Sequence, residues 1–189
     1  MISINLGAGR KPHQDIGIDR FALPGVAVVA DLEQGLPFLR DNAVDRVVCE
    51  HFLEHIEHFE RLLAEIHRVC KPGATVEIAV PHFSNPHYYS DYSHRRFFGL
   101  YTFDYFTPRA LQPLKRKVPD YYSGVRFRVV RREYGFASRV KVRRWLKALV
   151  QRYVNSSRGR QEFYEESLCW IVPCHEIRFV LAPIKEQAA

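Results

Sequence analysis

Small residues and carboxylates recur where short apolar segments of this chain end. Gly7-Ala8-Gly9 follows the apolar segment 2–6, and small residues there let a ligand approach backbone N–H groups. Asp19 ends a second segment, where a carboxylate can accept hydrogen bonds from both hydroxyls of a ribose. Asp31 ends a third, where it can accept from an exocyclic amino group, and Glu50-His51 ends a fourth. Taken singly, each of these residues could have a purely structural role, because a carboxylate at a strand end is often only a helix cap.

The apolar pattern predicts the elements that position these residues. Apolar residues at three- and four-residue steps predict a helix over 51–70, which Lys71-Pro72-Gly73 would end. The continuous apolar run 26–30 indicates a strand buried on both faces of a parallel sheet. A second helix, basic and amphipathic, is expected over 140–154, with an apolar face of Trp145, Leu146, Leu149, Val150 and Tyr153. Strands are expected at 2–6, 15–19, 26–30, 44–49, 74–80, 125–133 and 175–181.

Strands that alternate with helices predict an α/β fold with a mostly parallel sheet and right-handed crossovers. The last two strands, separated by a helical insert, are expected to form an antiparallel pair at one edge. Ligands of such sheets bind at the carboxyl ends of the strands, where the strand order reverses. We therefore expect the glycines and carboxylates described above to converge in space.

These motifs carry a resemblance to a known family. Over residues 1–110 the chain resembles class I S-adenosylmethionine (SAM)-dependent methyltransferases, and is most similar to a small bacterial branch described as type 11. The resemblance implies a Rossmann-like, mostly parallel seven-stranded sheet with helices on both faces, within one domain of residues 1–189. Residues 1–80 would be its SAM-binding half, 81–124 a roof on the acceptor side, and 125–189 the C-terminal strands with a basic helical insert. The matching segments are Ile4-Asn5-Leu6-Gly7-Ala8-Gly9, Gly17-Ile18-Asp19, Ala30-Asp31-Leu32, Glu50-His51-Phe52-Leu53-Glu54-His55-Ile56, Lys71-Pro72-Gly73 and Val76-Glu77-Ile78-Ala79-Val80-Pro81.

The resemblance also implies roles for individual residues around SAM. Asp19 would bind the ribose hydroxyls, and Asp31 would bind the adenine amino group with Leu32 against the ring. Glu50 and His51 would flank the methionine end, with His55 one helical turn behind His51. The cofactor-binding set it implies is Leu6, Gly7, Ala8, Gly9, Asp19, Arg20, Asp31, Leu32, Glu50 and His51.

The first crossover departs from the pattern of a dinucleotide site. Only nine residues separate Gly9 from Asp19, and Arg10-Lys11-Pro12 stands where a third small residue would be. The first crossover helix is therefore expected to be a single turn or missing. This argues against NAD, whose pyrophosphate needs that helix N-terminus, and is compatible with SAM, which has no phosphate.

The segment 81–98 is dense in histidine and tyrosine and leaves the fifth predicted strand, so it should cover the methyl end of the cleft. A general base helps methyl transfer only when the acceptor atom must lose a proton. His82 is the best-placed candidate, followed by His87, Asp91 and His94. The alternative is that His82 and His94 merely hold the segment to the body. No metal site is expected, because the spacing of His82, His87 and His94 matches no standard pattern.

The whole chain has a formal net charge of +7, and its basic residues are concentrated in one part of it. Residues 114–160 hold 15 Lys and Arg but only Asp120 and Glu133 as acids, so this block could attract phosphates, nucleic acid or an anionic membrane. The four cysteines form no CxxC pair, which favours buried reduced thiols. With no apolar run long enough to span a membrane, a cytoplasmic location is expected, with peripheral membrane contact as an option.

Three functions compete. The first is a methyltransferase for a small, saccharide or lipid-linked hydroxyl compound, because aromatic residues of 81–98 suit sugar rings and the basic helix suits a phosphate-bearing acceptor. The second is an RNA methyltransferase, supported by the basic block but lacking an Asn-Pro-Pro-Tyr-type motif and a separate RNA-binding domain. The third is a non-catalytic SAM-binding module. Salt-sensitive RNA binding with methyl incorporation would favour the second, and absence of SAM binding in calorimetry the third.

Overall fold

Seven strands form a single sheet in the computed structural model, which describes residues 1–10, 14–137 and 141–185 and the side chains of all these except 141–144. The strands are β1 (Ser3–Leu6), β2 (Ile16–Asp19), β3 (Val26–Val29), β4 (Val44–Glu50), β5 (Cys70–Pro81), β6 (Phe127–Gly135) and β7 (Glu176–Pro183). Each predicted strand is confirmed, with its ends shifted by a few residues.

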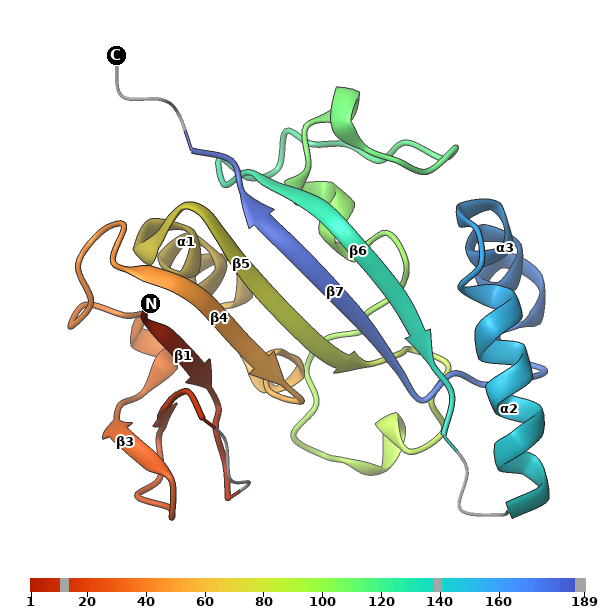
Figure 1. Ribbon diagram of the computed structural model, residues 1–189, viewed down its shortest axis with the longest axis horizontal. Helices are drawn as coiled ribbons and strands as arrows, with labels where there is room; N and C mark the ends of the chain where they lie inside the picture. Colours follow the sequence, from red (N-terminus) through yellow and green to blue (C-terminus); the bar gives the residue numbers. More distant parts are fainter. Residues whose placement is uncertain (11–13, 138–140, 186–189) are drawn as a thin grey trace.

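The strand order is β3-β2-β1-β4-β5-β7-β6. Strands β3, β2, β1, β4 and β5 are parallel to one another, whereas β7 runs antiparallel to both β5 and β6. The order reverses between β1 and β4, so the carboxyl ends of these two strands flank the expected ligand cleft. The predicted mostly parallel sheet with its antiparallel edge pair is confirmed (Figure 1).

The helical segments are the α-helices α1 (Phe59–Val69), α2 (Lys141–Val154) and α3 (Arg158–Phe163), the short 3-10 segments η1 (Leu32–Gln34), η2 (Leu53–His55), η3 (Tyr88–Ser90), η4 (Thr102–Phe106) and η5 (Arg109–Leu111), and a π-turn η6 (Tyr164–Leu168). In Figure 1, α1 lies behind the sheet and α2 and α3 stand beside its β6 edge. The opposite face of the central strands carries ion-paired side chains, among them Arg46 with Glu77 and Arg178 with Glu176, where a covering helix was expected.

The main core lies between the sheet and α1. Helix α1 buries Leu62, Leu63 and Ile66 against the strands because these residues share one side of the helix. Phe103 extends the core, with its ring centroid 4.8 Å from that of Phe179 on β7. The segment after β5 is thus packed on the same core that supports the cleft.

Two predicted elements need correction. The strand at 26–30 was expected to be buried on both faces, but β3 is the edge strand and Val29 is 58% exposed. The predicted helix over 51–70 begins only at Phe59, because His51, directly after β4, has a φ of 50° and a 3-10 turn follows it. His55 therefore does not lie one helical turn behind His51.

The first crossover contains no helix within the residues described between β1 and β2, as the short spacing from Gly9 to Asp19 predicted. All four cysteines are free and buried, which confirms the expectation of unpaired thiols. No helix among the described residues has the length and apolar character needed to cross a membrane.

Candidate active site

The glycine turn after β1 is held by the carboxylate of Asp19. Asp19 Oδ2 accepts from the backbone N–H of Gly9 at 3.0 Å, and Oδ1 accepts from that of Phe21 at 3.0 Å. Gly7 donates from its own N–H to the carbonyl of Ile18 at 2.9 Å. A carboxylate has about four lone-pair sites, so Asp19 keeps acceptor capacity for a ribose while it fixes the bend.

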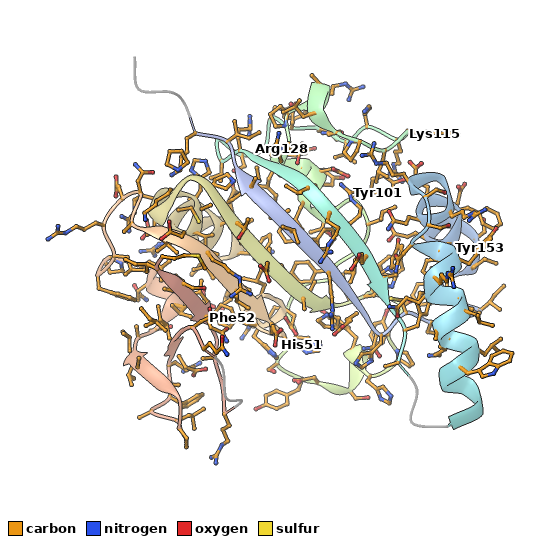
Figure 2. The ribbon with its side chains drawn as sticks, viewed as in Figure 1. His51, Phe52, Tyr101, Lys115, Arg128 and Tyr153 are labelled. Carbon is orange, nitrogen blue, oxygen red and sulfur yellow. The ribbon has the colours of Figure 1, made fainter. Side chains whose placement is uncertain are left out.

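The two glycines of this turn face different surroundings. Both have positive φ, 68° at Gly7 and 60° at Gly9. A Cβ on Gly7 would lie 2.3 Å from the ring of Phe52, whereas a Cβ on Gly9 would meet nothing within 4 Å. Gly7 therefore makes room for the ring of Phe52, a residue labelled in Figure 2, whereas Gly9 leaves its backbone open to a ligand.

This difference predicts the cost of filling the turn. Gly7→Ala is expected to destabilise the protein by about 3 kcal/mol, because left-handed backbone strain and displacement of Phe52 add together. Gly73→Ala is the matched control, since Gly73 has a φ of 82° and open space around it, and should cost only about 1–2 kcal/mol. Urea unfolding of both variants measures the difference; equal losses would contradict the role given to Phe52.

A cavity of about 450 Å³ opens beyond the carboxyl ends of β2 and β3. Asp31 lines it while also capping η1 by accepting from the N–H of Glu33 at 3.2 Å. Asp31 thus caps a helical turn, which was the ordinary alternative for a carboxylate at a strand end, and it also faces a cavity. Its other lining residues are Arg20, Glu33, Gln34, His55, Glu57, His58, Tyr92, Ser93 and Arg95.

Of the ten residues in the predicted cofactor site, only Arg20 and Asp31 line this cavity. Tyr92, Ser93 and Arg95, from the segment after β5, line it beside them. Asp19 faces the glycine turn instead and does not line the cavity. Leu6 and Leu32 are buried in the core at 0% and 4% exposure, and Ala8 is buried at 7%, so Leu6 can offer a ligand only its backbone.

His51 lies at the end of β4 between two carboxylates, and Glu50 beside it is exposed. Its Nε2 is 3.0 Å from Glu176 Oε2, and its Nδ1 is 3.6 Å from Glu54 Oε1. These contacts, first the hydrogen bond to Glu176, raise the pKa of His51 to about 9, and His51 in turn lowers the pKa of Glu176 to about 2. At neutral pH His51 is therefore a cation suited to an anionic group, and not a proton acceptor.

None of the four predicted catalytic residues lines the cavity, although the ring of His94 packs against that of the lining residue His55. His82 is 0% exposed; its Nδ1 lies 2.8 Å from Ser84 Oγ and its Nε2 lies 3.2 Å from Glu165 Oε2. Because β5 leads directly into the core here, His82 holds the segment to the body, which is the alternative considered from the sequence. His87 and Asp91 are exposed, and none of His82, His87, Asp91 and His94 belongs to the described lining of the cavity.

Glu54, Glu176 and Phe52 are site residues that the sequence did not assign. Glu176 comes from the start of β7, and only the pairing of β7 with β5 brings it to the end of β4. Glu54 was placed on a helix that does not form there. No strand-end signal marks either carboxylate, because Glu176 is the first residue of β7 and Glu54 lies four residues beyond the end of β4.

The site offers features that suit an adenosyl ligand. Asn5 Oδ1, on β1 beside the glycine turn, is one of two buried side-chain oxygens in the described residues that lack a hydrogen-bond partner. The open backbone at Gly9 and the cavity-facing Asp31 provide further unfilled positions. The residues present therefore fit SAM at the carboxyl ends of β1 to β4.

Solved structures with a similar fold show which class of protein has this strand order. A SAM-dependent methyltransferase from Archaeoglobus fulgidus has a TM-score of 0.59 and 15% identity, over 95% of this chain and 85% of that one. A possible histamine N-methyltransferase from Thermotoga maritima has a TM-score of 0.54 and 15% identity, over 97% and 82%. The phosphoethanolamine N-methyltransferase 2 of Haemonchus contortus, solved with SAM, has a TM-score of 0.55 and 15% identity, over 97% and 48%. The fold is that of class I SAM-dependent methyltransferases.

Part of the chain also matches a protein-family model. Residues 10–78 match the type 11 model described as a methyltransferase domain, and no curated protein matches the chain. Over these residues the chain is similar to SAM-dependent methyltransferases, the class whose fold it shares, and SAM is the cofactor that the match and the fold indicate. Bound SAM supplies a methyl group activated by a positively charged sulfur.

Proposed function

We propose that the protein methylates a hydroxyl group on a saccharide acceptor that is linked to a lipid and carries phosphate. The observation that carries this proposal is the surface of α2. Trp145 is 65% exposed, Leu146 55%, Leu149 54% and Tyr153 53%, although an amphipathic helix usually buries such residues against its sheet. Exposed aromatic and aliphatic side chains on a basic helix favour contact with an anionic membrane surface.

Trp145, Leu146, Leu149 and Tyr153 form what we call the α2 surface, and further apolar residues are exposed later in the chain. Phe163 at the end of α3 is 51% exposed, and Trp170 and Ile171 after it are 66% and 74% exposed. Lys147 and Arg152 supply positive charge on α2, and the block 114–160 supplies more. Combining apolar insertion with charge attraction supports a lipid-linked phosphate more strongly than an RNA duplex, which offers no apolar partner for Trp145.

Aromatic residues of the segment 81–98 support a saccharide as the part of the acceptor that reacts. Tyr89 is 59% exposed, Phe97 61% and Tyr92, which lines the cavity, fully exposed. Flat aromatic rings offer large contact areas to sugar rings. In this proposal Asp31 and Arg20 orient the adenosyl part of SAM, and the His51 cation pairs with the methionine carboxylate.

Vesicle binding tests the role of the α2 surface. The protein is expected to sediment with vesicles that contain phosphatidylglycerol and much less with pure phosphatidylcholine. A Trp145→Ser, Leu149→Ser variant should lose at least tenfold in partitioning, because two exposed apolar anchors are removed. Phe38→Ser, which removes an exposed aromatic residue elsewhere (45% exposed), is the control and should bind as the parent does.

Methyl transfer tests the acceptor directly. Radiolabelled methyl from SAM is expected in a lipid-linked oligosaccharide fraction of a bacterial membrane extract. Label in RNA, with binding that weakens steeply as salt is added, would instead support the RNA methyltransferase considered from the sequence.

A further inference from the structure

Glu54, His55 and His94 form a cluster next to the cavity. Each offers a ligand atom, and these three atoms lie within 4.8 Å of one another. Glu54 and His55 come from η2 after β4, and His94 comes from the segment that follows β5. The imidazole centroids are 4.9 Å apart, so two histidines separated by 38 residues meet here.

The carboxylate of Glu54 is incompletely satisfied. Glu54 is 1% exposed, and its Oε2 is the other buried side-chain oxygen, besides Asn5 Oδ1, that lacks a hydrogen-bond partner in the described part of the chain. Its Oε1 lies 3.6 Å from His51 Nδ1. A buried carboxylate oxygen without a donor is unfavourable, and a bound cation would remove that cost.

Hydrogen bonds fix which nitrogen of each histidine carries the proton. His94 Nδ1 lies 3.0 Å from the carbonyl of Tyr88, and a carbonyl only accepts, so Nδ1 is the donor. Ser93 Oγ donates its only proton to Asp91 Oδ1 at 2.6 Å and must accept from His55 Nδ1 at 2.9 Å. In the neutral form of both rings, Nε2 therefore keeps its lone pair.

Metal-binding histidines usually donate the N–H of their other ring nitrogen to a nearby acceptor, which fixes the ring. Here the acceptors are the Tyr88 carbonyl for His94 and the Ser93 hydroxyl, itself bonded to Asp91, for His55. Asp91 Oδ2 lies 3.6 Å from His94 Nε2, beyond hydrogen-bond distance, so this carboxylate does not hold Nε2 as a donor. Zinc ligands lie about 2.0–2.2 Å from the ion, so the three side chains need to close by roughly 1 Å.

We propose that Glu54, His55 and His94 bind a divalent transition-metal ion such as zinc. Two imidazoles and one carboxylate are a known zinc donor set, and three protein ligands leave a position for water or a substrate oxygen. Because His55 and Ser93 line the cavity, an ion held here would face the ligand space. This proposal replaces the expectation of no metal site, which considered only histidines of the segment 81–98.

Calorimetric titration of the chelator-treated, full-length protein with zinc chloride tests the site without SAM or acceptor. We expect one zinc ion per chain and at least a tenfold loss of affinity in His94→Ala and in His55→Ala. Ser93→Ala should weaken binding by about 10–100-fold, because it removes the group that orients His55. His87→Ala, which removes an exposed histidine of the same segment, is the control and should bind zinc as the parent does.

Cobalt(II) titration gives a second readout that needs no variant. Coordination by two histidines and a carboxylate should produce visible absorption bands that zinc abolishes by displacement. Absence of zinc binding to the parent protein, or equal affinity in His94→Ala and the parent, would overturn the site. Because these measurements use neither SAM nor acceptor, their failure would leave the proposed methyl transfer untouched.

Discussion

An Asp31→Ser variant is expected to bind SAM at least tenfold more weakly than the parent protein, a loss of about 1.4 kcal/mol in binding free energy. Asp31 lines the cavity, and in the proposed site its carboxylate accepts from the adenine amino group. A serine hydroxyl is too short to reach the same donor, so the hydrogen bond to the ligand should be lost. Calorimetry with SAM measures this change.

The control for this prediction separates the two roles of Asp31. Its carboxylate also accepts from the N–H of Glu33 as the cap of η1. Serine caps helices well, whereas alanine does not, so Asp31→Ala should lose about 0.5–2 kcal/mol of stability that Asp31→Ser retains. Both variants should lose SAM affinity equally. Parental affinity in both would show that Asp31 is only a cap.

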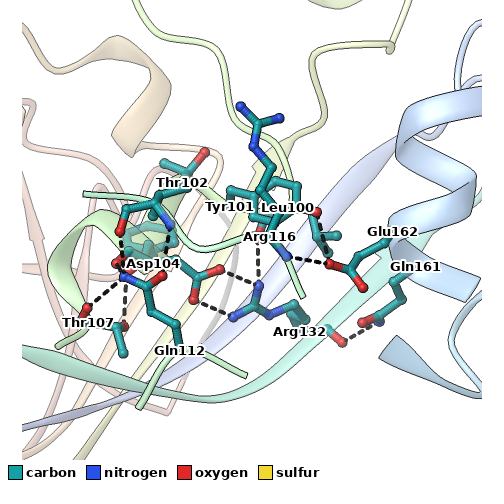
Figure 3. A network of polar contacts seen from close by, with 12 residues as sticks. Leu100, Tyr101, Thr102, Asp104, Thr107, Gln112, Arg116, Arg132, Gln161 and Glu162 are labelled. Carbon is teal, nitrogen blue, oxygen red and sulfur yellow. Dashed lines mark hydrogen bonds and ion pairs between the residues drawn. The ribbon is translucent and has the colours of Figure 1, made fainter. Parts of the chain in front are cut away.

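Arg132→Ala is expected to lower the free energy of unfolding by about 3–5 kcal/mol, because it leaves the buried carboxylate of Asp104 without its partner. The two side chains are 5% and 1% exposed, and they form two parallel hydrogen bonds of 2.8 and 2.9 Å. Arg132 also donates to the carbonyl of Leu100 at 2.9 Å. Figure 3 shows this pair joining the segment after β5 to β6.

Urea unfolding measures this loss, and a paired substitution provides the comparison. Arg132→Met with Asp104→Leu removes both charges and should be markedly more stable than Arg132→Ala, because neither partner then remains as an unpaired buried ion. Arg131→Ala is the control at the neighbouring, exposed position and should change stability by less than about 1 kcal/mol. If Arg132→Ala also lowered the free energy of unfolding by less than about 1 kcal/mol, the buried pair would not stabilise the fold as proposed.

The alternation of buried and exposed side chains along β6 follows the sequence pattern in only part of the strand. Val125, Phe127 and Val129 were expected to face one way with arginines facing the other, and Phe127 is indeed buried while Arg128 is exposed. A register shift between Val129 and Arg131 reverses the alternation, so that Arg132 and Tyr134 face inward. An extra residue in one strand flips every later side chain, and no local signal in the sequence marks it.

Strand β3 and helix α2 form where the sequence predicts them, but the burial of their apolar residues depends on neighbours that the local sequence does not reveal. An apolar run indicates that a segment favours burial, but its neighbours decide whether burial is available. The run at 26–30 lies at the sheet edge, so β3 has a partner only in β2. The apolar side of α2 remains largely exposed because the helix stands beside the β6 edge of the sheet.

The sequence by itself determined the strands, their mostly parallel direction and the placement of Gly9, Arg20 and Asp31 just after the first three strands, because these follow from local apolar runs and crossover rules. Tertiary structure alone decided which distant groups meet there: Glu176 beside His51, and His94 beside Glu54 and His55. It also buried His82, the preferred catalytic candidate. Local pattern is set by backbone geometry over a few residues, whereas these contacts depend on strand pairing and on the path of the segment after β5.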